Sequence, residues 1–338
     1  MSPPLRLLVF GMACAASAPT LAALLEAGFA VEALVLPGGA SAHPDRRSAL
    51  TPQPPLPCEG EGEQSASAKD SPPSRVGDPR GEGVGGGGRS PQPAASPQIL
   101  GRCGEPERLA AAAGVPVFRA APDAPRVLAL ASGVDAIVVA CFPVRLPPDL
   151  LARPRLGGLN VHPSLLPLGR GPEPVFWTLR RGERRTGATV HRLDAGWDTG
   201  SVVIQRAVAV LAGVRAPDLE RDLMALGGTL LVEALPLLAA GRLVPIPQDD
   251  AQATRAPVPA PADWLVPTDL PAGWAFNFVR GVSPLGEPLA VRGPFGIVPV
   301  RDAVAHHPTE RPDVLLEERP GGILRVRFSP GWVEFEPG

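Results

Sequence analysis

Residues 5–37 read LRLLVFGMACAASAPTLAALLEAGFAVEALVLP, and this stretch decides the class of fold. The apolar runs LRLLVFG and AVEALVLP are typical of parallel strands that are buried on both faces. The segment between them is a predicted helix: Ser17 suits its N-cap, Pro19 suits its first turn, and Gly28 can end it. The order of strand, helix and strand indicates the first unit of an open α/β sheet.

Predicted strands and helices continue to alternate after the first unit. Helices are predicted over 105–114, 123–132, 147–152 and 174–182, and strands over 116–118, 135–141, 157–162, 187–194 and 201–210. The alternation predicts an α/β protein with a Rossmann-like, doubly wound and mostly parallel sheet. In such a sheet, ligands bind beyond the carboxyl ends of the strands, where the strand order reverses.

Changes in composition divide the chain into segments. We predict a catalytic α/β domain over 1–206, a helical connection over 207–245, a proline-rich linker over 246–261 and a C-terminal β domain over 262–338. The last domain is expected to be a small OB-like barrel, because it contains several short runs with alternating apolar residues.

The catalytic domain is interrupted by an insertion at about 42–102. This stretch is rich in proline, glycine, serine and charged residues, so it has too little apolar surface to offset the entropy of ordering, and we expect it to be disordered. It contains GEGVGG at 81–86, which has the spacing of a dinucleotide-binding glycine motif. No predicted strand precedes that motif and no predicted helix follows it, so this interpretation is rejected.

The composition limits the class of protein. The chain has 338 residues and a net charge of −2, so no global positive potential indicates a nucleic acid or membrane partner. Its four cysteines stand apart in the sequence, which favours thiols in a reducing compartment over a disulfide or a metal site: Cys14, Cys58, Cys103 and Cys141. No uninterrupted apolar run reaches the ~20 residues of a membrane span. We therefore expect a cytoplasmic protein without a bound metal.

Asn160 and His162 stand two residues apart at the carboxyl end of a predicted strand. Residues i and i+2 of a strand share a face, so both side chains point the same way. An amide beside an imidazole can stabilise an oxyanion, and the imidazole can also exchange a proton near neutral pH. Asp198, in a glycine-flanked turn, would orient the histidine and favour its protonated form. The three residues together suit acyl transfer to an amine without a serine or cysteine nucleophile.

NVHPSLLPLGRG at 160–171, TGATVH at 186–191 and DTG at 198–200 resemble the motifs of the folate-dependent formyltransferase family. The resemblance covers roughly 1–40 and 105–245, and residues 252–291 are similar to the start of the C-terminal domain of methionyl-tRNA formyltransferases. It implies transfer of a formyl group from the co-substrate 10-formyltetrahydrofolate to a primary amine, with the methionyl amine of initiator Met-tRNA as the first candidate.

The resemblance also implies roles for individual residues. It implies three catalytic residues: Asn160, His162 and Asp198. It implies a folate-binding set in two segments: Phe142, Val144, Leu146, Ser164, Leu165, Leu166 and Pro167. It implies a set that binds the acceptor substrate: Arg46, Arg170 and Gly171.

Departures from the family pattern leave the acceptor amine open. Leu168 and Gly169 stand where the family commonly has aromatic or basic residues, and residues 172–174 read Pro-Glu-Pro. Residues 261–338 hold seven arginines, no lysine and ten acids, a net charge of −3, whereas a tRNA-binding domain should offer phosphate contacts. An amino-sugar nucleotide or another small amine is the alternative acceptor. Glycinamide ribonucleotide is disfavoured, because its enzymes resemble the first domain alone.

Two other classes of protein compete with this interpretation. WDTGSVV at 197–203 resembles the turn of aspartic proteases, but the chain has one such motif and no β-rich N-terminal half. A non-catalytic folate- or tRNA-binding module would not need all three proposed catalytic residues. We therefore expect an enzyme that acts as a monomer, with His191 buried in its strand as a structural residue.

Overall fold

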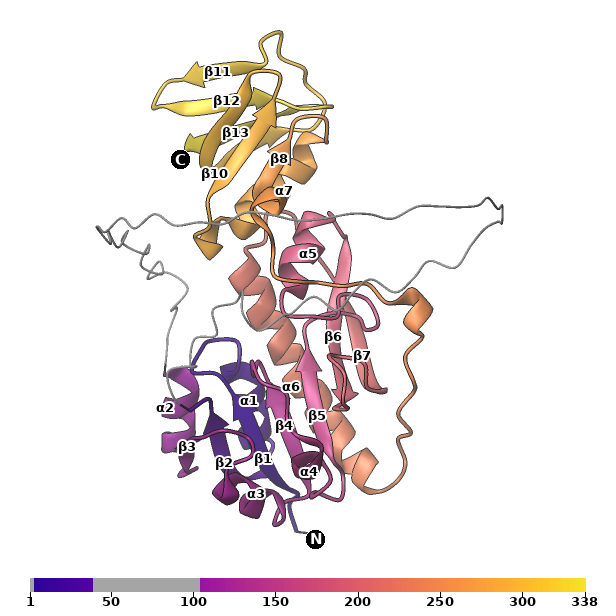
Figure 1. Cartoon of the computed structure of the whole chain (residues 1–338). Coiled ribbons are helices and arrows are strands. Elements are labelled where there is room, and N and C mark those ends of the chain that lie inside the picture. Colours follow the sequence, from indigo (N-terminus) through magenta and orange to yellow (C-terminus); the bar gives the residue numbers. More distant parts are fainter. Residues whose placement is uncertain (1–2, 39–103) are drawn as a thin grey trace, which may run out of the picture.

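The computed structural model describes residues 3–38 and 104–338 (Figure 1). The predicted insertion at 42–102, and with it Arg46 and two of the four cysteines, lies outside the described residues. The described chain forms two sheets, one from each end of the sequence.

The first sheet has seven strands in the order β3-β2-β1-β4-β5-β6-β7. They are β1 (Arg6–Gly11), β2 (Ala30–Leu36), β3 (Val117–Arg119), β4 (Ala136–Ala140), β5 (Gly158–His162), β6 (Arg185–Arg192) and β7 (Val202–Ala209). The first five strands are parallel to one another, and β6 and β7 each run antiparallel to the strand before. The predicted mostly parallel sheet is confirmed, and its strand order reverses between β1 and β4.

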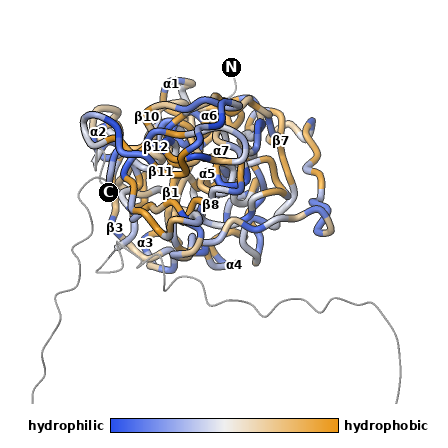
Figure 2. Tube along the Cα trace, turned by 90° about the horizontal axis from the view of Figure 1, so that it is seen from above, coloured by the Kyte–Doolittle hydropathy of each residue, from blue (hydrophilic) through white to orange (hydrophobic). Residues whose placement is uncertain are grey.

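Helices cover both faces of this sheet. On one face, Leu7 and Val9 share a core with α1 (Ala18–Glu26), α2 (Glu105–Ala112) and α6 (Ala216–Ala239). On the other, Leu8 and Phe10 share a core with α3 (Pro125–Ala131) and α4 (Pro148–Leu151). Successive residues of β1 thus enter opposite cores, which explains why the strand is apolar from Leu7 onward and mostly hydrophobic in Figure 2.

The loop after β1 is held close to the end of β4. Ser17 stands at the N-cap position of α1, but its hydroxyl does not cap the helix as predicted. The hydroxyl accepts a hydrogen bond from Met12 N–H at 2.9 Å and donates one to Ala140 O at 2.7 Å. Gly28 follows the helix with φ +79°, as expected for a glycine that ends a helix.

Helix α6 is the one helix in the described ranges that is long and apolar enough to cross a membrane by length and composition alone. Half of its most apolar stretch is buried within the protein, where Leu230, Leu231 and Leu235 join the core. A Cβ added at Gly227 would collide with Val161 of β5, so the glycine permits a close approach of helix and strand. The apolar composition of α6 is therefore accounted for by its packing.

The second sheet has six strands in the order β11-β12-β13-β10-β9-β8. They are β8 (Leu265–Pro267), β9 (Leu289–Gly293), β10 (Gly296–His307), β11 (Leu316–Arg319), β12 (Ile323–Arg327) and β13 (Trp332–Pro337), and α7 (Ala272–Val282) packs on them. Neighbouring strands are antiparallel except β8 and β9. The predicted antiparallel domain is confirmed. Its pairing runs from one edge strand to the other, so closure into a barrel stays a prediction.

Helix α5 (Pro174–Arg180) joins the two sheets. Phe176 packs against Trp264 and Phe278, with ring centroids 4.8 Å and 5.6 Å apart, and Arg215 pairs with Asp302 at 2.7 Å. After α6, residues 241–260, here called the return segment, run back past β7 to the second sheet (Figure 1). The predicted linker at 246–261 overlaps this segment, and Ile246 pairs with Val202 of β7 in the first sheet. The domain boundaries predicted from composition stay a proposal.

Candidate active site

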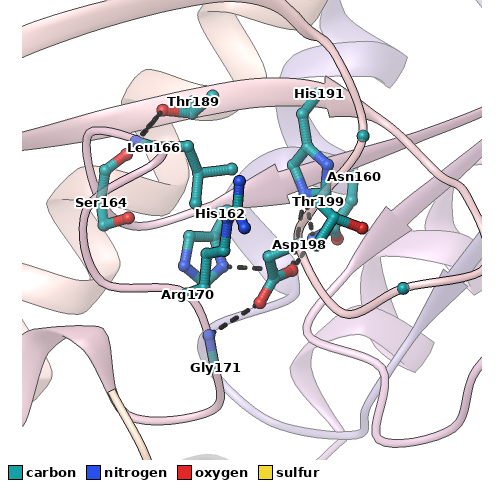
Figure 3. A network of polar contacts seen from close by, with 12 residues as sticks. Asn160, His162, Ser164, Leu166, Arg170, Gly171, Thr189, His191, Asp198 and Thr199 are labelled. Carbon is teal, nitrogen blue, oxygen red and sulfur yellow. Dashed lines mark hydrogen bonds and ion pairs between the residues drawn. The ribbon is translucent and has the colours of Figure 1, made fainter. Parts of the chain in front are cut away.

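The candidate site lies at the carboxyl ends of the central strands. Asn160 and His162 project from the end of β5, and Asp198 lies in the turn between β6 and β7 (Figure 3). Asn160 pairs with Val139 of β4 on one side and with His191 of β6 on the other. The site is therefore one strand away from the point where the strand order reverses, the region where open α/β sheets bind ligands.

His162 is held between a carboxylate and a backbone carbonyl. Its Nδ1 lies 3.7 Å from Asp198 Oδ1, and its Nε2 lies 2.8 Å from Gly169 O. A carbonyl oxygen only accepts, so Nε2 carries a hydrogen and Nδ1 faces the carboxylate. The side chains of His162 and Asp198 are only 6% and 11% exposed, so their interaction is weakly screened by water. A second proton on the ring would lie on Nδ1, beside the carboxylate.

Asp198 is held as a carboxylate in a strained turn. Burial by itself raises the pKa of Asp198, but interactions with His162 and His191 and the Gly171 N–H outweigh burial and hold that pKa well below its usual range. The Gly171 N–H donates to Asp198 Oδ2 at 2.9 Å. Asp198 has φ +56°, a left-handed conformation that is uncommon outside glycine and that is found often at functional sites.

His191 belongs to the site, which the sequence did not predict. Its Nδ1 donates to Arg192 O at 2.8 Å. Its Nε2 lies 3.0 Å from Asn160 Nδ2, from which it accepts when the ring is neutral, and 3.5 Å from Asp198 Oδ1, with which it pairs when the ring is protonated. It is buried and hydrogen-bonded, as expected of a structural residue, but it also orients the Asn160 amide. The second amide hydrogen of Asn160 faces Asp198 Oδ1 at 3.5 Å, a long bond that can be exchanged for a ligand. The motif TGATVH includes His191, but only the register of β5 and β6 places it opposite Asn160.

The loop Ser164–Pro167 is fixed by β6 and β7. Thr189 Oγ1 donates to Ser164 O at 2.6 Å and accepts from Leu166 N–H at 3.2 Å, and Gln205 Nε2 donates to Leu166 O at 3.0 Å. Leu166 is buried, and Leu165 packs over Gly187. Ser164 Oγ donates to Leu168 O at 2.6 Å. The loop is therefore a rigid wall beside His162, and its predicted contact with folate remains a prediction.

The three predicted folate contacts after β4 differ in exposure. Phe142 packs edge-on against Phe10, with centroids 5.2 Å apart, and Leu146 is buried in the core. Val144 is 45% exposed and can contact a ligand directly. Arg145 donates to Ala195 O at 2.7 Å, which ties this segment to the turn that carries Asp198.

Arg170 is engaged inside the protein rather than presented to a substrate. It is 7% exposed, and its Nε and Nη2 donate to Gln248 Oε1 at 3.0 Å and 2.8 Å. Gln248 Nε2 in turn donates to Asp198 O at 2.8 Å and to Gly200 O at 2.7 Å. The return segment is thereby attached to the turn of Asp198. The sequence did not indicate Gln248, because nothing local distinguishes it from a linker residue.

The predicted acceptor residue Gly171 has a geometric requirement of its own. Its φ is +120°, and an added Cβ would lie 2.7 Å from Ala256 O in the return segment. Glycine is therefore the residue that lets the loop, the return segment and the carboxylate of Asp198 meet. Arg46, the remaining predicted acceptor residue, lies outside the described residues.

Comparisons with known proteins place the chain in a family. Residues 98–235 match the family described as Formyl transferase. The methionyl-tRNA formyltransferase of Anaeromyxobacter dehalogenans (strain 2CP-1 / ATCC BAA-258) is 43% identical over 235 residues, which are 68% of this chain and 70% of the relative. The methionyl-tRNA formyltransferase of Anaeromyxobacter sp. (strain K) is 42% identical over 180 residues, 52% of this chain and 57% of the relative.

A solved structure shares the whole fold. The N-formyltransferase from Helicobacter canadensis, in complex with folinic acid and dTDP-3-aminofucose, superposes with a TM-score of 0.58, and 99% of each chain is covered. The two sequences are 12% identical, so this likeness concerns the fold alone. The α/β fold, the matched residues and the 43% identity to a curated relative together show that this chain belongs to the formyl transferase family.

Proposed function

We propose that this protein transfers a formyl group from 10-formyltetrahydrofolate to the methionyl amine of initiator Met-tRNA. The proposal rests on one observation above all: Asn160 and His162 lie together at the end of β5, beside a buried carboxylate. The two methionyl-tRNA formyltransferases that are 42–43% identical support the choice of acceptor. The Helicobacter canadensis structure with folinic acid supports a folate donor.

In the proposed reaction, the acceptor amine nitrogen attacks the formyl carbon, and the bond between that carbon and folate N10 then breaks. The tetrahedral intermediate carries an oxyanion, which the second amide hydrogen of Asn160 can stabilise. One such donor is typically worth about 10²–10³ in rate. The amine loses a proton and N10 gains one, and His162 is the group placed to pass it.

Asp198 acts as an electrostatic partner of His162 and does not itself accept the proton. Because its pKa is held low, it stays ionised and stabilises the protonated ring of His162. Both nitrogens of His162 face protein groups, so bound substrates must displace one contact before the imidazole reaches the reacting atoms. The bond to Gly169 O is the one we expect to open, since Gly169 is in the loop beside the proposed acceptor site.

An amino-sugar nucleotide is the second candidate acceptor. Two observations favour it: the net charge of −3 over residues 261–338, and a fold shared along 99% of the chain with an enzyme whose structure contains dTDP-3-aminofucose. A tRNA acceptor should instead release counterions on binding and give strongly salt-dependent affinity.

The test is formyl transfer by the full chain with 10-formyltetrahydrofolate and either Met-tRNA or a dTDP-amino sugar. We expect acid-stable formylmethionine on the tRNA, lost in His162→Ala and retained in His307→Ala, a histidine of the second sheet. Transfer to the dTDP-amino sugar alone would make the amino sugar the acceptor and would leave the proposed formyl-transfer reaction in place. Absence of any donor turnover by a folded protein would refute the proposed function.

A further inference from the structure

Two cysteines that are far apart in the sequence meet at the edge of the candidate site. Cys14 lies in the loop after β1, and Cys141 is the first residue after β4. These strands are neighbours, with Gly11 paired to Ala140. The Ser17 hydroxyl bonds to Met12 N–H and to Ala140 O, which holds the loop of Cys14 over the end of β4. From the sequence alone, the cysteines were expected to be separate thiols, because they stand apart along the chain.

The segments that carry the two thiols contact each other. Cys141 Sγ lies 3.9 Å from Met12 Sδ, and Cys14, two residues after Met12, accepts a hydrogen bond from Ser17 N–H at 3.3 Å through its carbonyl oxygen. Both cysteines are thiols and both are partly exposed, so a small oxidant can reach them. A cysteine that is accessible and placed next to a second cysteine has the arrangement of a redox-sensing pair.

Cys14 is the thiol of the pair whose pKa is lowered. Interaction with the Cys141 side chain lowers the pKa of Cys14 to about 6, with help from the backbone N–H groups of Ala16 and Ser17, against burial and the charge of Glu220. The thiolate is therefore the main form of Cys14 at neutral pH, and the thiolate is the species that attacks an oxidant.

The pair is also close to the groups that are proposed to act on substrate. Ala140 is paired with Val161, so Cys141 follows the end of β4 beside the strand end that carries His162. Cys141 directly precedes Phe142, which packs on Phe10 of β1. A covalent change at Cys141 therefore acts on the start of the segment that is expected to line the folate pocket.

We propose that Cys14 and Cys141 form a reversible dithiol–disulfide site through which hydroperoxides slow this enzyme. The Cys14 thiolate attacks a peroxide oxygen and the O–O bond breaks. Cys14 sulfenic acid forms, and hydroxide leaves from hydrogen peroxide or an alkoxide from an organic hydroperoxide. The Cys141 sulfur then attacks the Cys14 sulfur, the S–O bond breaks, and the Cys141 proton leaves with the oxygen as water. Two electrons pass from the sulfurs to the peroxide. A dithiol reductant reverses the change by thiol–disulfide exchange.

The disulfide joins the loop after β1 covalently to Cys141, the first residue after β4. We expect the next residue, Phe142, to shift with Cys141. Misplacement of reacting groups by one ångström can cost ~10²-fold in rate, so we expect turnover to fall about tenfold or more. The effect on turnover rests on the proposed formyl transfer, whereas formation of the disulfide does not.

The test uses the full chain with Cys58→Ser and Cys103→Ser, so that two thiols remain. Hydrogen peroxide at pH 7, followed by non-reducing peptide mapping, should give a peptide that links Cys14 to Cys141 and that dithiothreitol removes. In a Cys141→Ser variant, dimedone should trap sulfenic acid at Cys14. Oxidation of Cys14 to sulfinic acid without a linked peptide, or disulfides only between chains, would overturn the assignment.

Turnover of the same samples is measured in parallel. Loss of turnover that dithiothreitol restores supports the proposal, and full turnover by the disulfide form refutes the regulatory effect. Failure of the reduced protein to turn over the donor would count against the proposed function. The peptide map would still decide the disulfide site, so the two failures are distinguishable.

Discussion

Gln248→Leu tests whether the return segment positions the catalytic turn. Gln248 donates to Asp198 O and Gly200 O and accepts from Arg170. Leucine has a similar size and removes all of these bonds. Arg170, itself buried, would keep the bond to Asp250, whose side chain is 84% exposed and holds it weakly.

The expected magnitude follows from the bonds that are lost. A hydrogen bond between neutral groups contributes about 1 kcal/mol net, and one from a charged group about 1.5–3 kcal/mol. Gln248 is half-buried, so water replaces part of the loss, and we expect the free energy of unfolding to fall by about 2–3 kcal/mol. The turn of Asp198 loses its backbone support, so we also expect kcat to fall by about 10–100-fold, with a smaller change in KM.

Gln252→Leu is the matched control. Gln252 lies four residues further along the return segment, and its side chain bonds to the exposed Asp249. Its replacement should change the free energy of unfolding by less than about 0.5 kcal/mol and leave kcat unchanged. Denaturant unfolding and steady-state formyl transfer, measured on both variants, separate the two positions. If Gln248→Leu behaves like Gln252→Leu in both assays, the positioning role of Gln248 is refuted.

Three further variants test the same site and the insertion. Asp198→Asn should lower kcat by about 10²–10⁴-fold, whereas Asp135→Asn, the same change at a carboxylate bonded to Arg155, should leave kcat unchanged. Because the folded-state pKa of Asp198 is lowered, its ionisation stabilises the protein above about pH 4. In denaturant titrations, the difference in free energy of unfolding between wild type and Asp198→Asn should therefore shrink as the pH falls below about 4. A difference that grows at low pH would contradict the lowered pKa. Gly171→Ala should lower the free energy of unfolding by about 1–3 kcal/mol and Gly241→Ala by less, because, of these two glycines, Gly171 alone faces a backbone carbonyl. Equal melting temperatures of the two variants would contradict this. Deletion of 52–98 should leave the melting temperature nearly unchanged, and a large drop would show that this stretch is packed.

The first sheet was predictable because its signals are local. Each strand of the β1 and β2 unit is a near-continuous apolar run, since each is covered on both faces. Helix α7 was missed, because AGWAFNFVRGV contains two glycines and reads weakly as a helix. It is held by tertiary packing, with Phe278, Val279 and Val282 in the second core. Where tertiary packing rather than intrinsic propensity stabilises a helix, the local sequence pattern does not predict it.

In the candidate site, too, some features were predictable from the sequence and others depend on tertiary contacts. Strand periodicity predicted that Asn160 and His162 share a face, and the structure brings Asp198 to them. The roles of His191 and Gln248 were not predictable, because they depend on which residues the strand register and the return segment bring together. Arg170 was assigned to substrate from its motif, while its contacts are with Gln248 and Asp250.

The sequence by itself determined the class of sheet, and it predicted the edge of that sheet where a site is expected and the candidate residues Asn160, His162 and Asp198, because these depend on alternation and on motifs within a few residues. Only the tertiary structure decided the electrostatic environment of Asp198, the anchoring of the return segment and the contact between the loop after β1 and the end of β4. Those properties depend on burial and on contacts between residues distant in the chain. Such contacts exist only once neighbouring strands have paired and their loops have closed over the same edge.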